Sequence, residues 1–175
     1  FYFNFNTTKV TLVDVGGQKL ERNKWQPMFA GVDYLIFVVS LSDFDQYLWE
    51  EDSIRRTQDS IMLFSQIAGA EVFQDVPIFL IMNKVDAFQQ KLKRIPDKFK
   101  EAYPGFTPSH PTTGNEIDVN DAIEHIKKAF LKRVGSRSDK GWIESITTNA
   151  IDQESVKNLV QKIAVRVVND QSGKH

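Results

Sequence analysis

Polar and apolar residues alternate at the start of the chain, which is the pattern of a strand that buries one face. Phenylalanine occupies positions 1, 3 and 5, residues 6–8 have the composition of a turn, and the alternation resumes over residues 9–13. We therefore predict a β-hairpin that ends at Asp14.

Two later segments, residues 34–39 and 77–82, are continuous apolar runs, as expected for strands of a parallel sheet that is covered on both faces. Residues 143–147 are a weaker candidate for a last strand. Helix-length amphipathic segments separate these runs, at about 46–68, about 120–133 and about 153–168. Alternating strands and helices predict an open α/β sheet whose ligand lies beyond the carboxyl ends of the strands.

Residues 95–115 hold four prolines and two glycines and are expected to form a long surface loop. The sequence has no internal repeat and no domain boundary. With 175 residues, of which 41% are apolar, it has the size and composition of one globular domain.

Charge and cysteine content exclude several classes of function. The 22 Lys and Arg residues nearly balance the 23 Asp and Glu residues, so the charge gives no reason to expect a nucleic-acid partner. The absence of cysteine excludes disulfides, thiolate metal sites and a cysteine nucleophile, and fits a reducing, cytoplasmic location. We expect no transmembrane segment, since no apolar run approaches the roughly 20 residues that a bilayer requires.

The first candidate site follows the hairpin, where the sequence reads Asp14-Val15-Gly16-Gly17-Gln18. A carboxylate at a strand end can hold the hydration shell of Mg²⁺, and a glycine lets a backbone N–H approach a phosphate oxygen. The side-chain amide of Gln18 carries a donor and an acceptor, which suits it to orienting a water molecule for in-line attack. The alternative is a tight Gly-Gly turn after an edge strand, with Asp14 capping a helix.

The second candidate site, Asn83-Lys84-Val85-Asp86, follows the strand predicted at 77–82. The two carboxylate oxygens of Asp86 match the N1–H and 2-amino donors of guanine, a pair that adenine lacks. The stem of Lys84 can lie along the base, and Asn83 can join neighbouring loops while it reaches the base. The alternative is a polar strand-to-helix turn without a ligand.

The third candidate site, Thr148-Asn149-Ala150-Ile151-Asp152, follows the strand predicted at 143–147. The backbone amide of Ala150 could meet a base carbonyl, while Asp152 serves as the N-cap of the next helix. A helix cap without a ligand is the simpler alternative.

The order and spacing of these three segments resemble the G-domain of Ras-like GTPases. Residues 14–25, followed by Phe-Ala-Gly-Val at 29–32, resemble the switch II segment of heterotrimeric G-protein α subunits. The continuation Glu21-Arg22-Asn23-Lys24-Trp25 distinguishes this pattern from ADP-ribosylation-factor-type GTPases, which share only the Asp-Val-Gly-Gly-Gln run. Ser-Asp-Phe-Asp at 42–45 and residues 79–86 extend the resemblance over essentially the whole chain.

The resemblance implies an α/β, Ras-like doubly wound sheet of the P-loop type and a slow GTP hydrolase that signals as a G-protein α subunit. It implies a switch II segment at about 14–31 and guanine-specificity loops at 83–86 and 148–152. Gln18 would be catalytic, and Asp14 would bind Mg²⁺ through water. The implied nucleotide-binding residues are Asp14, Gly16, Gly17, Asn83, Lys84, Asp86, Thr148 and Ala150.

The family also implies partners: a βγ dimer, a downstream effector, a G-protein-coupled receptor and an RGS-type regulator. Arg22, Lys24 and Trp25 are the residues expected on the partner surface, and an equally favoured alternative places Trp25 in the core. We further expect Arg22 to pair with Asp59 when the γ-phosphate is present. The resemblance also implies attachment to the inner face of the plasma membrane through an N-terminal segment outside this sequence.

The sequence departs from the family in one major respect. It contains no Gly-x-x-x-x-Gly-Lys-Ser/Thr phosphate-binding loop, no first switch and no inserted helical domain. We therefore expect residues 1–175 to be the C-terminal portion of a Ras-like GTPase domain, inactive by itself and completed by another segment. The alternative function is a non-hydrolysing interaction module that retains only the switch II and effector surface.

Two smaller departures concern the third site and the tail. Asn149 and Ile151 stand where family members commonly carry cysteine and threonine. The polar end at 170–175 differs from the family's apolar, receptor-recognised tail.

Overall fold

The first two strands of the molecule form the predicted hairpin. The computed structural model describes residues 2–5, 8–25, 28–29, 31–110, 114–135 and 141–172. Strands β1 (Tyr2–Phe5) and β2 (Thr8–Thr11) pair in antiparallel register, with Phe3 opposite Val10.

A second sheet contains three parallel strands in the order β3-β4-β5. These are β3 (Leu35–Ser40), β4 (Ile78–Asn83) and β5 (Ile143–Thr147), so each predicted strand is confirmed to within one residue. The central strand β4 is an unbroken apolar run because both of its faces are covered.

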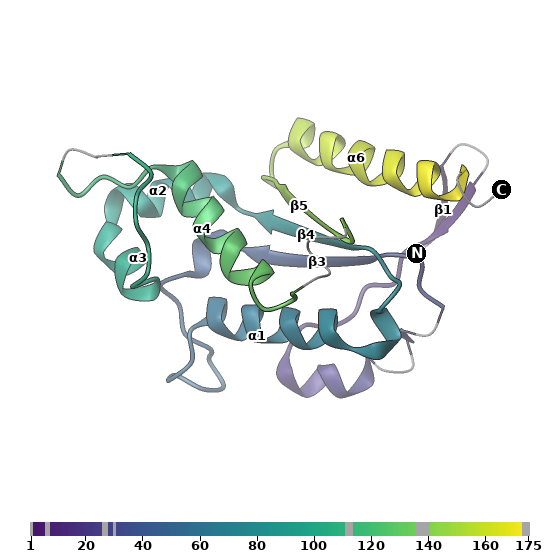
Figure 1. The fold of residues 1–175 in the computed structure, drawn as a ribbon, viewed down its shortest axis with the longest axis horizontal. Helices are drawn as coiled ribbons and strands as arrows, with labels where there is room; N and C mark the ends of the chain where they lie inside the picture. The colour runs from purple at the N-terminus through teal and green to yellow at the C-terminus, as the bar shows by residue number, and fades with distance from the viewer. Residues whose placement is uncertain are drawn as a thin grey trace.

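Helices cover both faces of the parallel sheet, as Figure 1 shows. Helices α1 (Arg56–Gly69) and α4 (Val119–Leu131) pack on one face around Phe64, Leu80 and Phe130. On the other face, α6 (Gln153–Ser172) packs against Phe79 and Ile81 of β4. This layered arrangement confirms the expected doubly wound α/β architecture.

The predicted loop at 95–115 is partly wrong, because it contains a helix. Helix α2 (Val85–Arg94) follows β4 and leads directly into α3 (Pro96–Ala102). Pro96 occupies the first position of α3, where its missing N–H has no intrahelical partner to lose. The ring of Phe99 in α3 is completely buried, which fixes this short helix against the core.

The helix predicted at about 46–68 begins later than expected. Residues 46–55 form a folded-back loop, in which Tyr47 and Arg55 make an isolated antiparallel bridge. Backbone hydrogen bonds from Leu48 N–H to Ile54 O and from Arg56 N–H to Gln46 O join its two arms. The loop ends where α1 begins (Figure 1).

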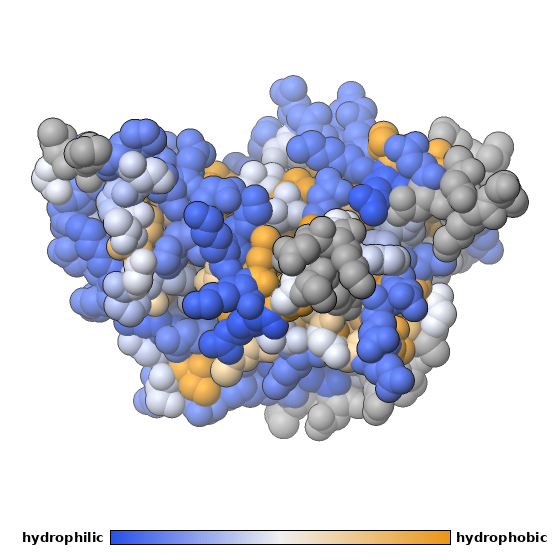
Figure 2. Space-filling model, in the orientation of Figure 1, coloured by the Kyte–Doolittle hydropathy of each residue, from blue (hydrophilic) through white to orange (hydrophobic). Residues whose placement is uncertain are grey.

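The described residues also form the short 3₁₀ helices η1 (Lys19–Lys24), η3 (Leu41–Asp43) and η4 (Glu71–Phe73). On the face drawn in Figure 2, apolar residues reach the surface in small groups among hydrophilic ones. No helix in the described part of the chain is both long and apolar enough to cross a membrane.

One face of β3 is open. Ile36 and Val38 are 42% and 60% exposed, although the register aligns them with Phe79 and Ile81, which α6 covers. Within the described residues, β3 pairs only with β4, so its outer edge is the edge of the sheet.

Candidate functional site

The carboxyl end of β4 turns sharply into α2 at Lys84. Lys84 has φ 63°, in the left-handed region, and its carbonyl accepts the first hydrogen bond of α2, from Phe88 N–H, at 2.9 Å. The side-chain oxygen of Asn83 accepts the Lys84 N–H at 2.7 Å and so supports this turn.

Asn83 also joins the two predicted guanine-specificity loops. Its Oδ1 accepts a hydrogen bond from the backbone N–H of Ala150 at 3.0 Å, across 67 residues of sequence. The expected role of Asn83 in joining neighbouring loops is therefore present in the structure. The Ala150 amide, which the sequence assigned to a base carbonyl, here donates to Asn83, so a base carbonyl would have to share or replace that contact.

The loop at 148–152 is held by hydrogen bonds on both sides. Thr148 N–H donates to Met82 O at 3.0 Å and extends the β4–β5 ladder, and the Thr148 side chain is buried. The Ser155 hydroxyl lies 2.9 Å from the Thr148 hydroxyl and accepts the Asn149 N–H at 2.9 Å. Asp152 accepts the Ser155 N–H at 3.0 Å, which confirms its predicted role as the N-cap of α6.

Asp86 lies in the first turn of α2 with its carboxylate free of internal partners. No hydrogen bond or ion pair within the described residues engages this half-buried side chain. The positive end of the helix dipole favours a negative charge there. Both carboxylate oxygens are therefore available to two adjacent donors on a ligand.

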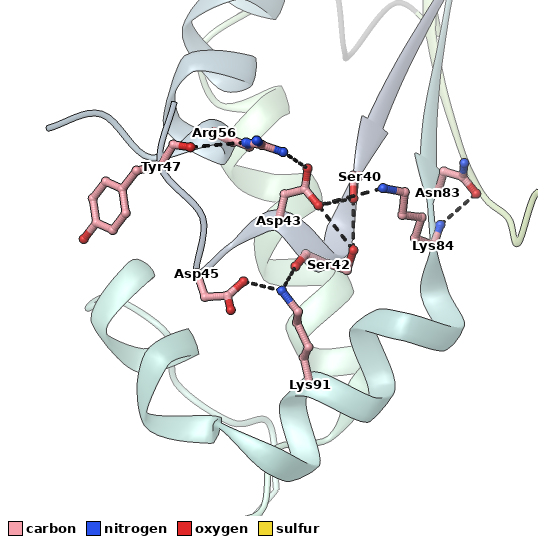
Figure 3. A network of polar contacts seen from close by, with 9 residues as sticks. All are labelled: Ser40, Ser42, Asp43, Asp45, Tyr47, Arg56, Asn83, Lys84 and Lys91. Atoms are coloured by element: carbon pink, nitrogen blue, oxygen red, sulfur yellow. Dashed lines mark hydrogen bonds and ion pairs between the residues drawn. The ribbon is translucent and has the colours of Figure 1, made fainter. Parts of the chain in front are cut away.

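A polar network lies beside Lys84, as Figure 3 shows. Asp43, just after β3, accepts a hydrogen bond from Ser40 Oγ at 2.7 Å. Its carboxylate also lies 4.0 Å from Lys84 Nζ and 3.6 Å from an Arg56 nitrogen. Asp43 thereby connects the ends of β3 and β4 with the start of α1.

The segment Asp14–Gln18 offers its polar groups to solvent. Asp14 and Gln18 are exposed, and neither side chain has a hydrogen-bond partner among the described residues. A Cβ atom added at Gly17 would meet nothing within 4 Å, so the space beside its Cα is open. At Gly16, by contrast, a Cβ would meet the carboxylate end of the flexible Glu21 side chain, which would have to move.

Helix η1 is fastened to α1 by an ion pair and by Trp25. Arg22 makes two parallel contacts with Asp59, at 3.2 and 2.6 Å, and its Nε donates to Gly17 O at 3.2 Å. Trp25 Nε1 donates to Gly16 O at 2.8 Å, while its ring packs with Ile67 and is only 8% exposed.

The Arg22–Asp59 pair is present, and its expected dependence on the γ-phosphate stays a prediction. Trp25 lies in the core, as the alternative interpretation of that residue held. The side chain of Lys24, the third residue expected on the partner surface, lies outside the described residues. Neither a hydrogen bond nor an ion pair in the described structure joins the Asp14–Gln18 segment to the two guanine-specificity loops.

The described residues contain no group of three or more His, Cys, Asp or Glu side chains that could enclose a metal ion. Asp14 is a single exposed carboxylate. Mg²⁺ retains several waters and is often held by one or two carboxylates together with substrate phosphates, so Asp14 fits a contact through water.

Comparison with known proteins agrees with this architecture. The family model for the G-protein alpha subunit matches residues 1–167. This chain belongs to the G-protein α subunit family. Guanine nucleotide-binding protein alpha-4 subunit of Dictyostelium discoideum is 32% identical over 167 residues, which cover 95% of this chain and 45% of the relative.

Two further G-protein α relatives come from distant eukaryotes. The alpha-1 subunit of Trichomonas vaginalis is 38% identical over 161 residues, covering 92% of this chain and 38% of the relative. The alpha-1 subunit of Saccharomyces cerevisiae is 33% identical over 129 residues, covering 74% of this chain and 26% of the relative. The chain thus spans about half or less of the length of the curated relatives it matches, and it has a Ras-like α/β fold.

Sequence reasoning missed two residues that build the site of this G-protein α chain. Ser155 was visible only as the third residue after the predicted cap Asp152, and nothing in that spacing indicates its bonds to Thr148 and Asn149. Asp43 lies three residues beyond the end of β3. The rule that ligands bind beyond the carboxyl ends of strands, which identified Asp14 and Asn83, could also have found it.

Proposed function

We propose that the protein is a guanine-nucleotide switch that binds GTP with Mg²⁺ and hydrolyses it slowly to GDP. The observation that carries this proposal is the hydrogen bond from Ala150 N–H to Asn83 Oδ1, which brings the two guanine-specificity loops together at the carboxyl edge of the sheet. Ligands of open α/β sheets bind at this edge.

Guanine recognition rests on Asp86, Asn83, Lys84 and the 148–150 loop. The free carboxylate of Asp86 accepts the N1–H and 2-amino hydrogens of the base. The buried Thr148 anchors the start of the 148–150 loop, and Asn83 holds the Ala150 amide. The Lys84 stem packs along the base plane while its ammonium group stays near Asp43.

Hydrolysis rests on positioning of the attacking water. The unengaged side chain of Gln18 accepts a hydrogen bond from the water and donates one to the transferring phosphoryl group. Gly17 is exposed and carries no side chain, so its N–H can approach a phosphate oxygen. When bound, Mg²⁺ neutralises developing phosphate charge, and Asp14 would hold one of its waters.

The switch itself is the segment at about 14–31. Its 3₁₀ helix is held to α1 by the Arg22–Asp59 pair and by Trp25, while Gly16 and Gly17 supply the carbonyls that close the turn. Loss of the γ-phosphate would remove a contact at Gly17 and loosen the same hydrogen-bonded unit, which couples nucleotide state to shape.

By family, the proposed partners of this surface are a βγ dimer, an effector, a receptor and an RGS-type regulator. The complete protein is proposed to act in the cytoplasm at the inner face of the plasma membrane.

The base-reading role is tested by Asp86→Asn in the complete protein. The amide would present a donor where guanine needs an acceptor, so we expect GTP affinity to fall by about tenfold or more. Xanthosine triphosphate carries a carbonyl in place of the 2-amino group, so its affinity should rise in the same variant. Calorimetric titration measures both affinities.

Asp75→Asn is the matched control, since Asp75 is an exposed carboxylate without a partner in the described structure. Equal GTP affinity in the Asp86 and Asp75 variants would refute guanine reading by Asp86. If the wild-type complete protein takes up neither GDP nor GTP, the non-hydrolysing interaction module replaces the switch as the function.

A further inference from the structure

The sulfur atoms of this chain belong to three methionines, since the sequence contains no cysteine. Met28 and Met62 are 48% and 39% exposed, whereas Met82, on the buried strand β4, is 1% exposed. Peroxides oxidise a methionine thioether to a sulfoxide, and a peroxide must first reach the side chain. Residues 1–175 therefore present two methionines to an oxidant in solution and protect the third.

Met28 lies on the η1 side of the contact between η1 and α1. Its N–H donates to Trp25 O at 2.8 Å, and Trp25 is the residue that anchors the end of η1 in an apolar cluster with Ile67 and Phe73. Phe29, the next residue, packs against the same cluster, and its ring centre lies 4.7 Å from that of Phe73. Met28 is thus half-exposed at the margin of a packed turn.

Met62 lies on the α1 side of the same contact. It follows Asp59 by three residues, so the two side chains are neighbours on the surface of the helix. Asp59 is the carboxylate that holds Arg22 of η1. Leu63, the next residue, packs against the cluster that contains Trp25, and Figure 1 shows the η1 segment beside α1. Both exposed methionines therefore border the contact that fastens η1.

Partial burial gives oxidation at these two positions a structural consequence. A thioether packs as an apolar group, whereas a sulfoxide is polar and is better solvated by water. An oxidised Met28 or Met62 side chain therefore turns toward solvent, and the apolar atoms that it covered become exposed. The contact between η1 and α1 loses the stabilisation that comes from burying those atoms.

We propose that Met28 and Met62 are sites of reversible oxidation by hydrogen peroxide, and that their sulfoxides loosen η1 from α1. In each reaction the O–O bond of the peroxide breaks, an S–O bond forms, and the sulfur gives up the two electrons that reduce the peroxide to water. A methionine sulfoxide reductase, which draws two electrons from a thiol, returns the thioether and releases the oxygen as water. Neither methionine belongs to the proposed guanine site, so this proposal and the guanine-reading function stand or fall separately.

The test treats the complete protein with hydrogen peroxide and follows each methionine by mass spectrometry of its peptides. We expect Met28 and Met62 to gain one oxygen atom at least about tenfold faster than Met82, which the peroxide cannot reach in the folded chain. Hydrogen exchange over residues 19–25 should then be at least about threefold faster than before oxidation, and sulfoxide reductases should restore the original rate. Equal oxidation of all three methionines, or unchanged exchange after oxidation of Met28 and Met62, would overturn the proposal.

The double variant Met28→Leu, Met62→Leu is the matched control, because leucine keeps the apolar volume and has no sulfur. Its exchange over residues 19–25 should equal that of the wild type and should not change with peroxide. A peroxide-dependent rise as large as in the wild type would assign the effect to another residue and overturn the proposal. The double variant Met28→Gln, Met62→Gln places polar amides at both positions and should show the faster exchange without any oxidant, whereas a wild-type rate would contradict the proposed loosening.

Discussion

Lys84 is the one non-glycine residue in the described structure with a positive φ. Such a conformation costs an L-residue about 1–2 kcal/mol, and strain of this kind is concentrated at functional sites. Here the left-handed turn directs the chain from β4 into α2 and leaves Lys84 Nζ near Asp43. The strained residue therefore lies in the proposed guanine site, at the point where the backbone turns abruptly from β4 into α2.

Replacing Lys84 with glycine separates the effect of its backbone strain on stability from the effect of its side chain on GTP binding. Lys84→Gly should leave the free energy of unfolding unchanged or raise it by up to about 1 kcal/mol, because glycine adopts a positive φ without strain. The same variant should weaken GTP binding, since it removes the stem proposed to pack on the base.

Lys93→Gly is the control for Lys84→Gly, because Lys93 is exposed inside α2. Glycine there should cost about 1 kcal/mol with no change in GTP affinity. Urea denaturation and nucleotide titration measure the two quantities, and a large loss of stability in Lys84→Gly would contradict the strain argument.

Gln18 allows a separate test of the chemical step. Gln18→Leu removes the water-orienting amide but leaves the base contacts intact, so GTP should bind with nearly wild-type affinity while hydrolysis falls by about 100-fold or more. Single-turnover hydrolysis of prebound GTP measures the step directly. Because the Gln18 side chain makes no hydrogen bond within the described structure, its loss should not change the melting temperature. An unchanged hydrolysis rate would remove Gln18 from the mechanism.

At the level of elements, the contact between η1 and α1 decides how the proposed switch can move. The guanidinium of Arg22 and the carboxylate of Asp59 are largely buried, with side-chain exposures of 21% and 9%. A bidentate pair in such a setting contributes more than a surface ion pair, because solvent screens it less. The pair therefore holds η1 down as a unit together with Trp25.

A double-mutant cycle on Arg22→Ala and Asp59→Ala measures this contact. We expect a coupling energy of about 1–3 kcal/mol and faster hydrogen exchange over residues 19–25 in each single variant. The exposed Lys19–Glu51 pair provides the control cycle and should show a smaller coupling. In the complete protein the coupling should be larger with a GTP analogue than with GDP, and equal values would contradict the nucleotide dependence.

At the level of the whole molecule, Tyr103 makes stability sensitive to alkaline pH. Burial raises the pKa of Tyr103 from 10.0 to about 12, and the nearby Thr57 hydroxyl opposes part of that rise without completing a hydrogen bond of good geometry. Because the folded-state pKa lies above the unfolded value, the contribution of Tyr103 is complete below pH 10.0 and is lost as the pH approaches about 12.

Tyr103→Phe tests this pH dependence. The wild-type protein should lose up to about 3 kcal/mol relative to Tyr103→Phe between those pH values, because two units of pKa correspond to that free energy. At neutral pH the variant should be as stable as the wild type or slightly more so, since it removes a buried hydroxyl without a partner. Denaturant titrations at several pH values give the difference, and parallel curves for the two proteins would refute the assignment.

The sequence predicted the elements whose signal is local. The uninterrupted apolar run of β4 and the alternation of the hairpin each specify a strand without reference to the rest of the chain. Residues 46–55 were included in the helix predicted at about 46–68, whereas the Tyr47–Arg55 bridge and the backbone hydrogen bonds beside it make them a loop. Helix α3 was missed because proline suggested a loop, although proline at a first helical position is favourable.

The site was predictable as a set of residues but not as a set of contacts. The sequence predicted that Asn83 joins neighbouring loops and that Asp152 caps a helix. The hydrogen bonds of both residues agree with these roles. The link between Asn83 and Ala150, and the support of Ser155 beneath the 148–150 loop, depend on how β4 and β5 lie side by side. Such proximity is a property of the tertiary fold, which no short motif of the sequence encodes.

The open side of β3 also bears on how the chain behaves in concentrated solution. Ile36 and Val38 offer methyl groups to water beside a row of strand amides and carbonyls without a strand partner in the described structure. Edges of this kind promote sheet-to-sheet adhesion between copies. Covering that strand should therefore improve solubility, and the expression yield of the chain would report it.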